Sequence, residues 1–558
     1  MENLHQLEII IMLLIAVLAL STVARAMLIP YPILLVIGGL LLSLIPGLPM
    51  IRLDPDLVFL VFLPPILWSA AYFTSLRDFR ANLRPISLLA VGLVLATTAG
   101  VAAVAHAVFP GMSWAAAVVL GAIVSPPDAV AATAVARRLN IPRRVITVLE
   151  GESLVNDATA LVLYRSAVAA VVSGTFVLSE TLIDFLFAAI VGVLIGLAVG
   201  MVTRWAVHST DDSFSEIVVT LLAPYAAWVL AEQAHASAVL ACVAGGLYLR
   251  QYFSAVAPAT RIQGRAVWDV IVFALNGLIF ILIGLQLGTL REAVSSEHAG
   301  ALVLNGAMIS VTAIVVRLIW VPTIAYVSRW LIPSLRVRDP TPPRSHLFLV
   351  AWTGMRGIVS LAAAMALPLA TVDGTAFPFR AEIILMTFAV IFSTLVLQGL
   401  SLAPLIRALK LENDQTLEKE ETQAREHAAT AALERLDTLE KESWSIQDQV
   451  HRLRDHYARR VKRFSFPDKI DPECSAETAA AFRRLRYETL TAERLAAVSL
   501  RDQGIISDEV LHRIENELDV ESLRIGVGEQ RIAPACNGGQ RPMAISPGYD
   551  TTMEKENP

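Results

Sequence analysis

Apolar residues are concentrated in thirteen long runs over residues 1–410, and charged residues, proline or glycine separate each run from the next. A membrane-spanning helix needs about 20 mostly apolar residues, so the pattern predicts an all-α polytopic membrane domain. No basic segment of the kind found in signal peptides precedes the first run, which we expect to be retained as a span. The expected spans are 7–24, 30–47, 56–73, 85–109, 113–137, 144–172, 181–206, 214–232, 236–252, 265–289, 302–332, 345–370 and 380–409.

Basic residues predict the orientation of these spans. There is no lysine before Lys410, so arginine carries the signal. Loops after odd-numbered spans hold 16 arginines, whereas loops after even-numbered spans hold only Arg52, Arg291 and Arg380. Because basic loops stay in the cytoplasm, the N-terminus is expected outside and the C-terminal tail inside a cell (inner) membrane.

Charge density changes after residue 410. Residues 1–410 carry 45 charged side chains, whereas the last 148 residues carry 50. We expect residues 1–410 to form the membrane domain, residues 411–527 a cytoplasmic helical tail, and residues 528–558 a disordered C-terminus.

The tail has a helical composition. Residues 412–465 contain no glycine or proline and favour one long helix. Gly504 followed by Ser507 predicts a helix stop and an N-cap, hence a helical hairpin within 475–527. A regulatory or oligomerising role and a passive solvated helix both remain compatible with this pattern.

Composition also excludes several functions. The formal net charge of −5 and the absence of a Lys/Arg-rich run argue against a nucleic-acid partner. Cys242, Cys474 and Cys536 are far apart and predict neither a disulfide framework nor a zinc site. No phosphate-binding glycine loop or catalytic constellation is present, so we expect neither an enzyme nor a bound cofactor.

The first candidate site lies within the fifth span, in residues 121–131. Pro126 and Pro127 lack backbone donors and disfavour helix in the residue before them, so the helix should unwind near 124–128. Unwound backbone at membrane depth is tolerated only inside protein or along a cavity. Bare carbonyls beside Asp128 would suit a small hard cation. The alternative is a proline kink that serves packing alone.

The second candidate site lies on the sixth span, in residues 150–159. Helical spacing places Ser153, Asn156 and Asp157 on one face, with Glu152 at its edge. A carboxylate can hold a metal ion or a proton, so Asp157 could serve two competing ligands. The alternative is a buried hydrogen-bond network between helices.

Three arginines also fall inside predicted spans, at 165, 317 and 356. A charge at membrane depth costs at least about 2.5 kcal/mol and is a functional hypothesis by default. For Arg165 the competing interpretation is an ion pair that only fixes helix packing.

Four motifs resemble the monovalent cation/proton antiporters of the NhaP and eukaryotic sodium/proton exchanger type. They occur in the family order over roughly residues 5–410. The motifs are Phe62-Leu-Pro-Pro-Ile-Leu67, Ser125-Pro-Pro-Asp-Ala-Val-Ala131, Gly151-Glu-Ser-Leu-Val-Asn-Asp157 and Trp352-Thr-Gly-Met-Arg-Gly-Ile-Val-Ser360.

This resemblance implies thirteen helices in two inverted six-helix repeats, crossed discontinuous helices and a homodimer. It implies electroneutral exchange of one Na⁺, Li⁺ or K⁺ for one proton. By this resemblance, Asp157 would bind the cation and the proton, and Asp128, Ser153 and the Pro127 carbonyl would be co-ligands. Asn156 would hold the aspartates in place. Glu152 would pair with Arg317, or alternatively with Arg356.

The sequence departs from the family pattern at two places. Pro127-Asp128-Ala129 stands where many relatives have Thr-Asp-Pro, which removes a threonine hydroxyl from the site. Leu67-Trp-Ser-Ala-Ala71 lacks the acidic residue that relatives often carry in the third span. Oxygen ligands alone do not separate sodium from potassium, so a K⁺/H⁺ exchanger stays open, as do a cation channel and a sensor that signals through the tail.

Overall fold

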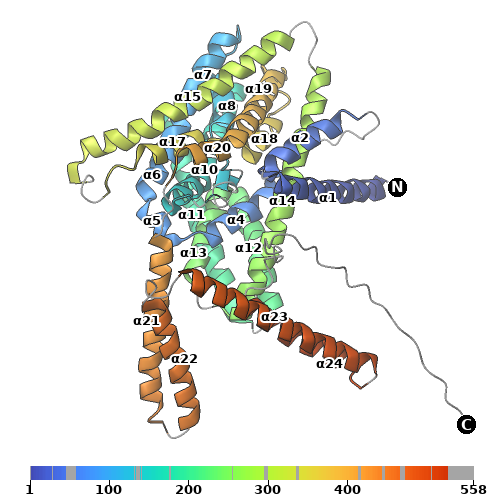
Figure 1. The fold of residues 1–558 in the computed structure, drawn as a ribbon. Helices are drawn as coiled ribbons and strands as arrows, with labels where there is room; N and C mark the ends of the chain where they lie inside the picture. The colour runs from blue at the N-terminus through green and yellow to red at the C-terminus, as the bar shows by residue number, and fades with distance from the viewer. Residues whose placement is uncertain are drawn as a thin grey trace, which may run out of the picture. The chain divides into compact units, whose positions relative to one another are not determined.

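The computed structural model describes residues 2–27, 29–45, 58–130, 132–133, 139, 141–174, 178–210, 212–253, 256–293, 299–334, 339–411, 416–442, 446–465, 472–503 and 505–525. The chain divides into two compact units, Met1–Asp414 and Gln415–Pro558. Within the described residues the regular structure is helical, with a single isolated β-bridge between Ala370 and Ala376 (Figure 1).

Eight stretches of the described chain are helical, long and apolar enough to cross a membrane. Two of them are continuous stretches built from several elements, Leu83–Val108 and Arg380–Ala408. The first stretch comprises α6 (Leu83–Ser87), a π-helical segment (Leu88–Leu93) and α7 (Val94–Val108). The second stretch comprises α19 (Arg380–Ser393), a π-helical segment (Thr394–Gln398) and α20 (Gly399–Ala408). The other six lie in α1 (Glu2–Ala26), α10 (Arg143–Ser173), α11 (Leu178–His208), α12 (Ser213–Gln233), α14 (Pro258–Ala293) and α15 (Ala299–Leu331).

Shorter apolar helices fill the remaining predicted runs. They are α2 (Tyr31–Ser43), α4 (Leu63–Phe73) with the π-helical turn Val58–Phe62 before it, α8 (Trp114–Val124) and α13 (Ala238–Gln251). The span predicted at 345–370 is divided into α17 (Arg344–Trp352) and α18 (Ile358–Met365), with a break between them. In the run predicted at 113–137 the helix ends at Val124, as the two prolines predict, while residues 134–138 lie outside the described ones.

Close helix contacts in the membrane unit depend on small residues. A side chain at Gly39 of α2 would overlap the Ile281 carbonyl of α14, and a side chain at Gly284 of α14 would overlap the Val36 carbonyl of α2. The two helices therefore pack backbone to backbone. Trp68 of α4 is fully buried against α13, where it lies over Gly245. This packing fixes α4 and α14, two walls of the cavity described below.

The second unit contains two helical hairpins. The first pairs α21 (Thr416–Leu439) with α22 (Gln447–Ser465), so the single long helix expected over 412–465 is wrong. Folding back buries Leu436 and Val450, and Arg454 of α22 bonds Asp437 of α21 at 2.8 Å. A continuous helix would leave these apolar side chains in water, which local composition cannot reveal.

The second hairpin joins α23 (Pro472–Asp502) to α24 (Asp508–Ile525). Ser507 caps α24, because its Oγ accepts from the Val510 N–H at 3.3 Å. Gly504 and the C-terminus expected at 528–558 lie outside the described residues.

Candidate functional site

Two breaks in helical segments of the membrane unit, Met1–Asp414, lie against each other, and we call this contact the crossing. The chain leaves helical conformation at 125–128, after α8, and again at 353–357, between α17 and α18. The Asp128 N–H donates to the Met355 carbonyl at 2.6 Å. Arg356 Nε donates to the Val124 carbonyl at 3.0 Å. Each broken segment therefore satisfies polar groups that the other leaves free, as backbone at membrane depth requires.

Arg356 holds this crossing together. Its side chain is buried, and besides Val124 it donates to the Gly354 carbonyl through Nη1. Its own backbone N–H donates to Thr394 Oγ1 at 3.1 Å. These partners are backbone and hydroxyl oxygens, so the alternative pairing of Arg356 with Glu152 is not what the structure places here.

Glu152 and Arg317 form a buried two-pronged ion pair. Arg317 Nη1 lies 2.5 Å from Glu152 Oε1 and Nη2 lies 2.8 Å from Oε2, and both side chains are 1% exposed. Arg317 Nε and Nη2 also donate to the Val350 carbonyl at 3.2 and 3.1 Å. The pair thus joins α10 to α15 and α15 to α17. Both charges are matched, as buried charges must be.

Asp128 is bound closely by the backbone around it. Its Oδ1 accepts from the Val130 N–H at 2.8 Å. A Cβ at Gly357 would overlap Asp128 Oδ2, so only glycine allows the second broken segment to lie against this carboxylate. The carboxylate is consequently held in one place at the crossing.

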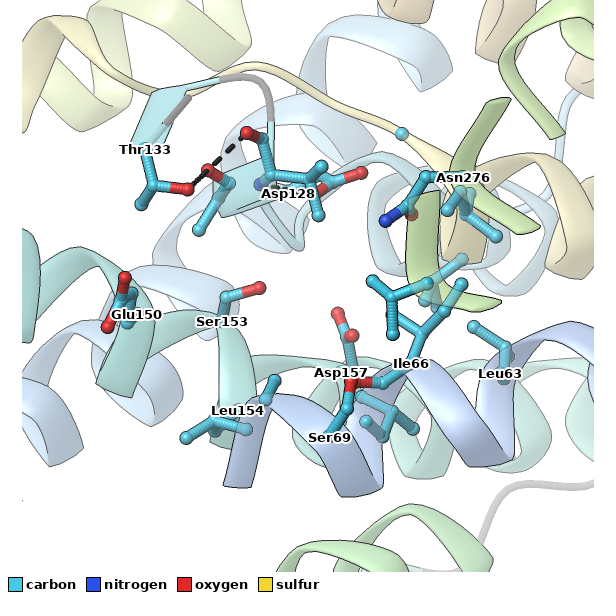
Figure 2. A pocket seen from close by; sticks show the side chains of 18 of the residues that line it. Leu63, Ile66, Ser69, Asp128, Thr133, Glu150, Ser153, Leu154, Asp157 and Asn276 are labelled. Atoms are coloured by element: carbon cyan, nitrogen blue, oxygen red, sulfur yellow. Dashed lines mark hydrogen bonds between the residues drawn. The ribbon is translucent and has the colours of Figure 1, made fainter. Parts of the chain in front are cut away.

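A cavity of about 440 Å³ lies beside the crossing. Figure 2 shows Asp157 and Ser153 pointing from α10 into this space, while Asp128 and Asn276 lie on the opposite wall. Pro127 also lines the cavity. The broken segment, α10, α14 and α4 therefore line one space, in which polar side chains lie among apolar ones.

Asn156 lies outside that lining although it neighbours Asp157. Its side chain is fully buried, and Nδ2 donates to the Pro127 carbonyl at 2.8 Å. The expected role was to hold the aspartates, but the contact shown is with the unwound backbone directly before Asp128. Asn156 thus ties α10 to the segment that carries Asp128.

The cavity has further polar lining that the sequence did not single out. Tyr31, Ser69, Thr133 and Ser360 contribute hydroxyls. Single hydroxyl residues inside apolar runs have no spacing that distinguishes them from packing residues, which explains why sequence analysis missed them.

One end of the cavity reaches the surface of the unit. Arg265 and Asp269, one helical turn apart on α14, line it and pair at 3.1 Å, with side chains 47% and 61% exposed. This exposed pair marks the mouth, whereas Asp157 at the inner end is buried.

Arg165 lies away from this cavity. It pairs with Glu232 of α12 at 2.7 Å, and both side chains are substantially exposed. They line a separate cavity of about 1060 Å³ next to the second half of α10. The packing interpretation of Arg165 fits this exposed pair.

The cation ligands that the central cavity offers are oxygen atoms. Among the residues that the structure describes, no group of three or more His, Cys, Asp and Glu side chains could hold a metal ion. A cation here would need the two carboxylates together with hydroxyl and carbonyl oxygens, a set that suits small hard cations. A carboxylate such as that of Asp157 can bind either a cation or a proton.

Comparison with known proteins identifies relatives over most of the chain. A family model described as the transmembrane sodium/hydrogen exchanger matches residues 10–408. The chain is 35% identical over 500 residues to an uncharacterized Na⁺/H⁺ exchanger of Mycobacterium tuberculosis (strain H37Rv), with 88% of this chain and 91% of that protein covered. It is 32% identical over 556 residues to the low-affinity Na⁺/H⁺ antiporter NhaS1 of Synechocystis, with 95% of each covered.

Another relative has a broader name. A sodium, potassium, lithium and rubidium/H⁺ antiporter of Bacillus pumilus is 32% identical over 415 residues, which is 72% of this chain and 61% of that protein. Among solved structures, the sodium proton antiporter MjNhaP1 from Methanocaldococcus jannaschii superposes with a TM-score of 0.56 at 18% identity, over 74% of this chain and 99% of that one. This likeness shows a shared fold.

Proposed function

Since the chain belongs to the sodium/hydrogen exchanger family and is a multi-pass membrane protein, we propose that it exchanges one monovalent cation for one proton, with both ions competing for Asp157. The observation that carries the proposal is the position of Asp157, which is buried at the inner end of an open cavity beside Asp128. A single carboxylate that serves both ions forces exchange, because neither ion binds while the other is present.

The cation would be held by Asp157, Asp128 and Ser153, all of which line the same cavity. The Pro127 carbonyl would be a further ligand. It already accepts from Asn156, and a carbonyl oxygen has a second lone pair to offer. Glu152, Arg317, Arg356 and Asn156 would support the site without binding the ion.

The membrane arrangement that we propose has thirteen passages. Eight long helical stretches, four shorter helices and the divided segment 344–365 support this number among the described residues. One broken segment in each half of the membrane unit supports two inverted repeats. With the N-terminus outside and the tail in the cytoplasm, the cavity mouth at Arg265 would face the cytoplasm. We further propose a homodimer in the cell (inner) membrane.

We propose Na⁺ as the principal cation, with Li⁺ as a substitute. K⁺ is the second candidate, because the Bacillus pumilus relative is named as an antiporter of sodium, potassium, lithium and rubidium for H⁺. The oxygen ligands proposed here are compatible with each of these ions.

Proton movement in inside-out vesicles with an imposed pH gradient tests the proposal. Na⁺, Li⁺ and K⁺ are added in turn to wild type, to Asp157→Asn and to Asp373→Asn, which makes the same chemical change in an exposed loop. We expect a cation to collapse the gradient in wild type and in the Asp373 variant but not in the Asp157 variant. Clamping the voltage with an ionophore should leave the rate unchanged.

Two results would contradict the proposal. Transport by Asp157→Asn at the wild-type rate would remove Asp157 from the exchange site. Cation flux without proton movement would favour a channel, since one shared carboxylate predicts obligatory coupling.

A further inference from the structure

Three arginines from separate parts of the membrane unit converge on one carboxylate. Arg84 Nη2 lies 2.6 Å from Asp339 Oδ2, and Arg144 Nη2 lies 2.6 Å from Asp339 Oδ1. Arg329 Nη2 lies 2.9 Å from Oδ2, and its Nε donates to the Asp339 carbonyl at 2.9 Å. These arginines come from α6, the first turn of α10 and the last turn of α15. We call them, with Asp339, the arginine cluster.

The arginine cluster has an excess of positive charge. Among the residues that the structure describes, all three guanidinium groups bond to the Asp339 carboxylate, whereas neighbouring Arg143 pairs with Asp78 at 2.5 Å. Arg84 Nη1 is buried and has no hydrogen-bond partner within the described part of the chain. The cluster can therefore accept a further anion with donors already in place.

An apolar cleft of about 80 Å³ lies directly beside these arginines. Arg84, Arg144 and Arg329 form one part of its lining. The remainder is mainly aliphatic and includes Leu88, Val145, Val148, Val321, Ile324 and Leu347. A site that combines guanidinium groups with an adjoining aliphatic cleft matches an amphiphile better than a soluble ion.

The level of the cluster along the helices also indicates an amphiphile. Arg329 lies in the last turn of α15, next to Tyr326 and Trp330, which are 45% and 71% exposed. Exposed tyrosine and tryptophan at the end of an apolar helix are typical of the membrane–water interface, where lipid headgroups lie. In the proposed orientation this is the cytoplasmic face, whose leaflet is rich in anionic lipid.

We propose that the arginine cluster binds an anionic phospholipid, with its phosphate held by Arg84 and Arg144 and the start of an acyl chain in the aliphatic cleft. Basic pockets between helices on the cytoplasmic side are suited to such headgroups. A bound lipid would brace α6, α10 and α15 against one another. Because α10 carries Asp157 and Glu152, and α15 carries Arg317, the lipid would support the helices that frame the ion site.

Native mass spectrometry of the full-length protein in non-ionic detergent tests this proposal. Phosphatidylglycerol, phosphatidylcholine with the same acyl chains, and glycerol phosphate without acyl chains are titrated separately. We expect wild type to retain phosphatidylglycerol in preference to phosphatidylcholine, and to bind glycerol phosphate weakly. The double variant Arg84→Gln/Arg144→Gln should bind phosphatidylglycerol on the order of 25-fold more weakly, since each basic residue contributes roughly fivefold.

Three variants keep the proposal falsifiable. Arg77→Gln/Arg80→Gln removes two exposed arginines outside the cluster and should bind like wild type. Ala325 also lines the cleft, so Ala325→Phe fills it while the arginines remain and should weaken phosphatidylglycerol binding. Asp339→Asn removes the competing carboxylate and should strengthen it, opposite to the arginine changes.

Several outcomes would overturn the proposal. Equal retention of both phospholipids by wild type would remove the role of charge. Wild-type affinity in Arg84→Gln/Arg144→Gln would place any anionic lipid elsewhere. Glycerol phosphate binding as tightly as phosphatidylglycerol, with Ala325→Phe unchanged, would identify a soluble phosphate ligand instead.

Discussion

The ion pair between Glu152 and Arg317 allows the support of the crossing to be measured separately from ion binding. Arg317→Met removes the guanidinium, keeps an unbranched apolar chain of similar length, and leaves the Glu152 carboxylate buried. Neither residue lines the cavity, so the proposed cation ligands stay intact. The expected effect is therefore on stability first.

The structure sets the size of this effect. Both side chains are 1% exposed, and Arg317 makes two bonds to the carboxylate and two to the Val350 carbonyl. Breaking a buried pair by removing one partner costs about 3–5 kcal/mol. With an unfolding entropy of about 2.1 cal/mol/K per residue, applied to the unit Met1–Asp414, this cost corresponds to a fall in Tm of roughly 3–6 °C.

The double variant Glu152→Met/Arg317→Met provides the decisive comparison. It leaves no unpaired charge, and apolar replacements of buried pairs are often neutral or stabilising. We expect its Tm, measured by thermal unfolding in detergent, to lie above that of Arg317→Met. A matched control is Arg265→Met in the exposed pair with Asp269, which should change stability by less than about 1 kcal/mol.

Additive losses would refute this reasoning. If the double variant fell by the sum of the two single losses, the pair would not be coupled. If Arg317→Met were as stable as wild type, the buried carboxylate would have found another partner, and the ion pair would not support the crossing.

Two further changes test the crossing itself. Gly357→Ala should abolish exchange in the vesicle assay, because its Cβ would displace the Asp128 carboxylate. The control Gly300→Ala, whose Cβ meets no atom within 4 Å, should transport normally. Exchange by the Gly357 variant would show that Asp128 can move without loss of transport. Asn156→Asp replaces the donor to the Pro127 carbonyl by an acceptor, so it should cost about 1–3 kcal/mol in thermal unfolding. An unchanged Tm would mean that this hydrogen bond does not hold the unwound segment.

Much of the crossing could be predicted from local chemistry. Pro126 and Pro127 forbid a regular helix whatever surrounds them, and α8 ends at Val124 accordingly. The resemblance implied crossed discontinuous helices, but local chemistry did not place the second break, because Thr353–Gly357 contains no proline. There the helix gives way to contacts with the other segment, such as the Asp128 N–H bond to Met355.

The sequence left open which arginine pairs with Glu152. Arg317 and Arg356 both lie within apolar spans, and nothing in their local sequence says which one meets Glu152. The structure separates them by position, with Arg317 on the carboxylate and Arg356 on the carbonyls of Val124 and Gly354. The bonds to Glu152 and to the Val124 carbonyl join residues more than 150 positions apart, and helical spacing cannot predict contacts over such a separation.

Tertiary packing also determines that residues 412–465 form a helical hairpin and not one long helix. Their composition favours helix throughout, and helix is what forms on both sides of the turn. The turn exists because folding back buries Leu436 and Val450 and lets Arg454 reach Asp437 and Glu440. Local propensity therefore predicted the type of structure but not its termination.

The two carboxylates of the cavity differ in how firmly they are held, and this difference assigns their parts in the proposed exchange. Asp128 accepts from the Val130 N–H and lies against Gly357, so in the proposed exchange it would act as a fixed negative charge. Asp157 projects into the cavity from the middle of an unbroken helix. Two uncompensated carboxylates in a buried space repel each other strongly, so the site is stable only when a cation or a proton neutralises one of them. The fixed charge of Asp128 would thus oblige Asp157 to give up one ion only as it takes the other.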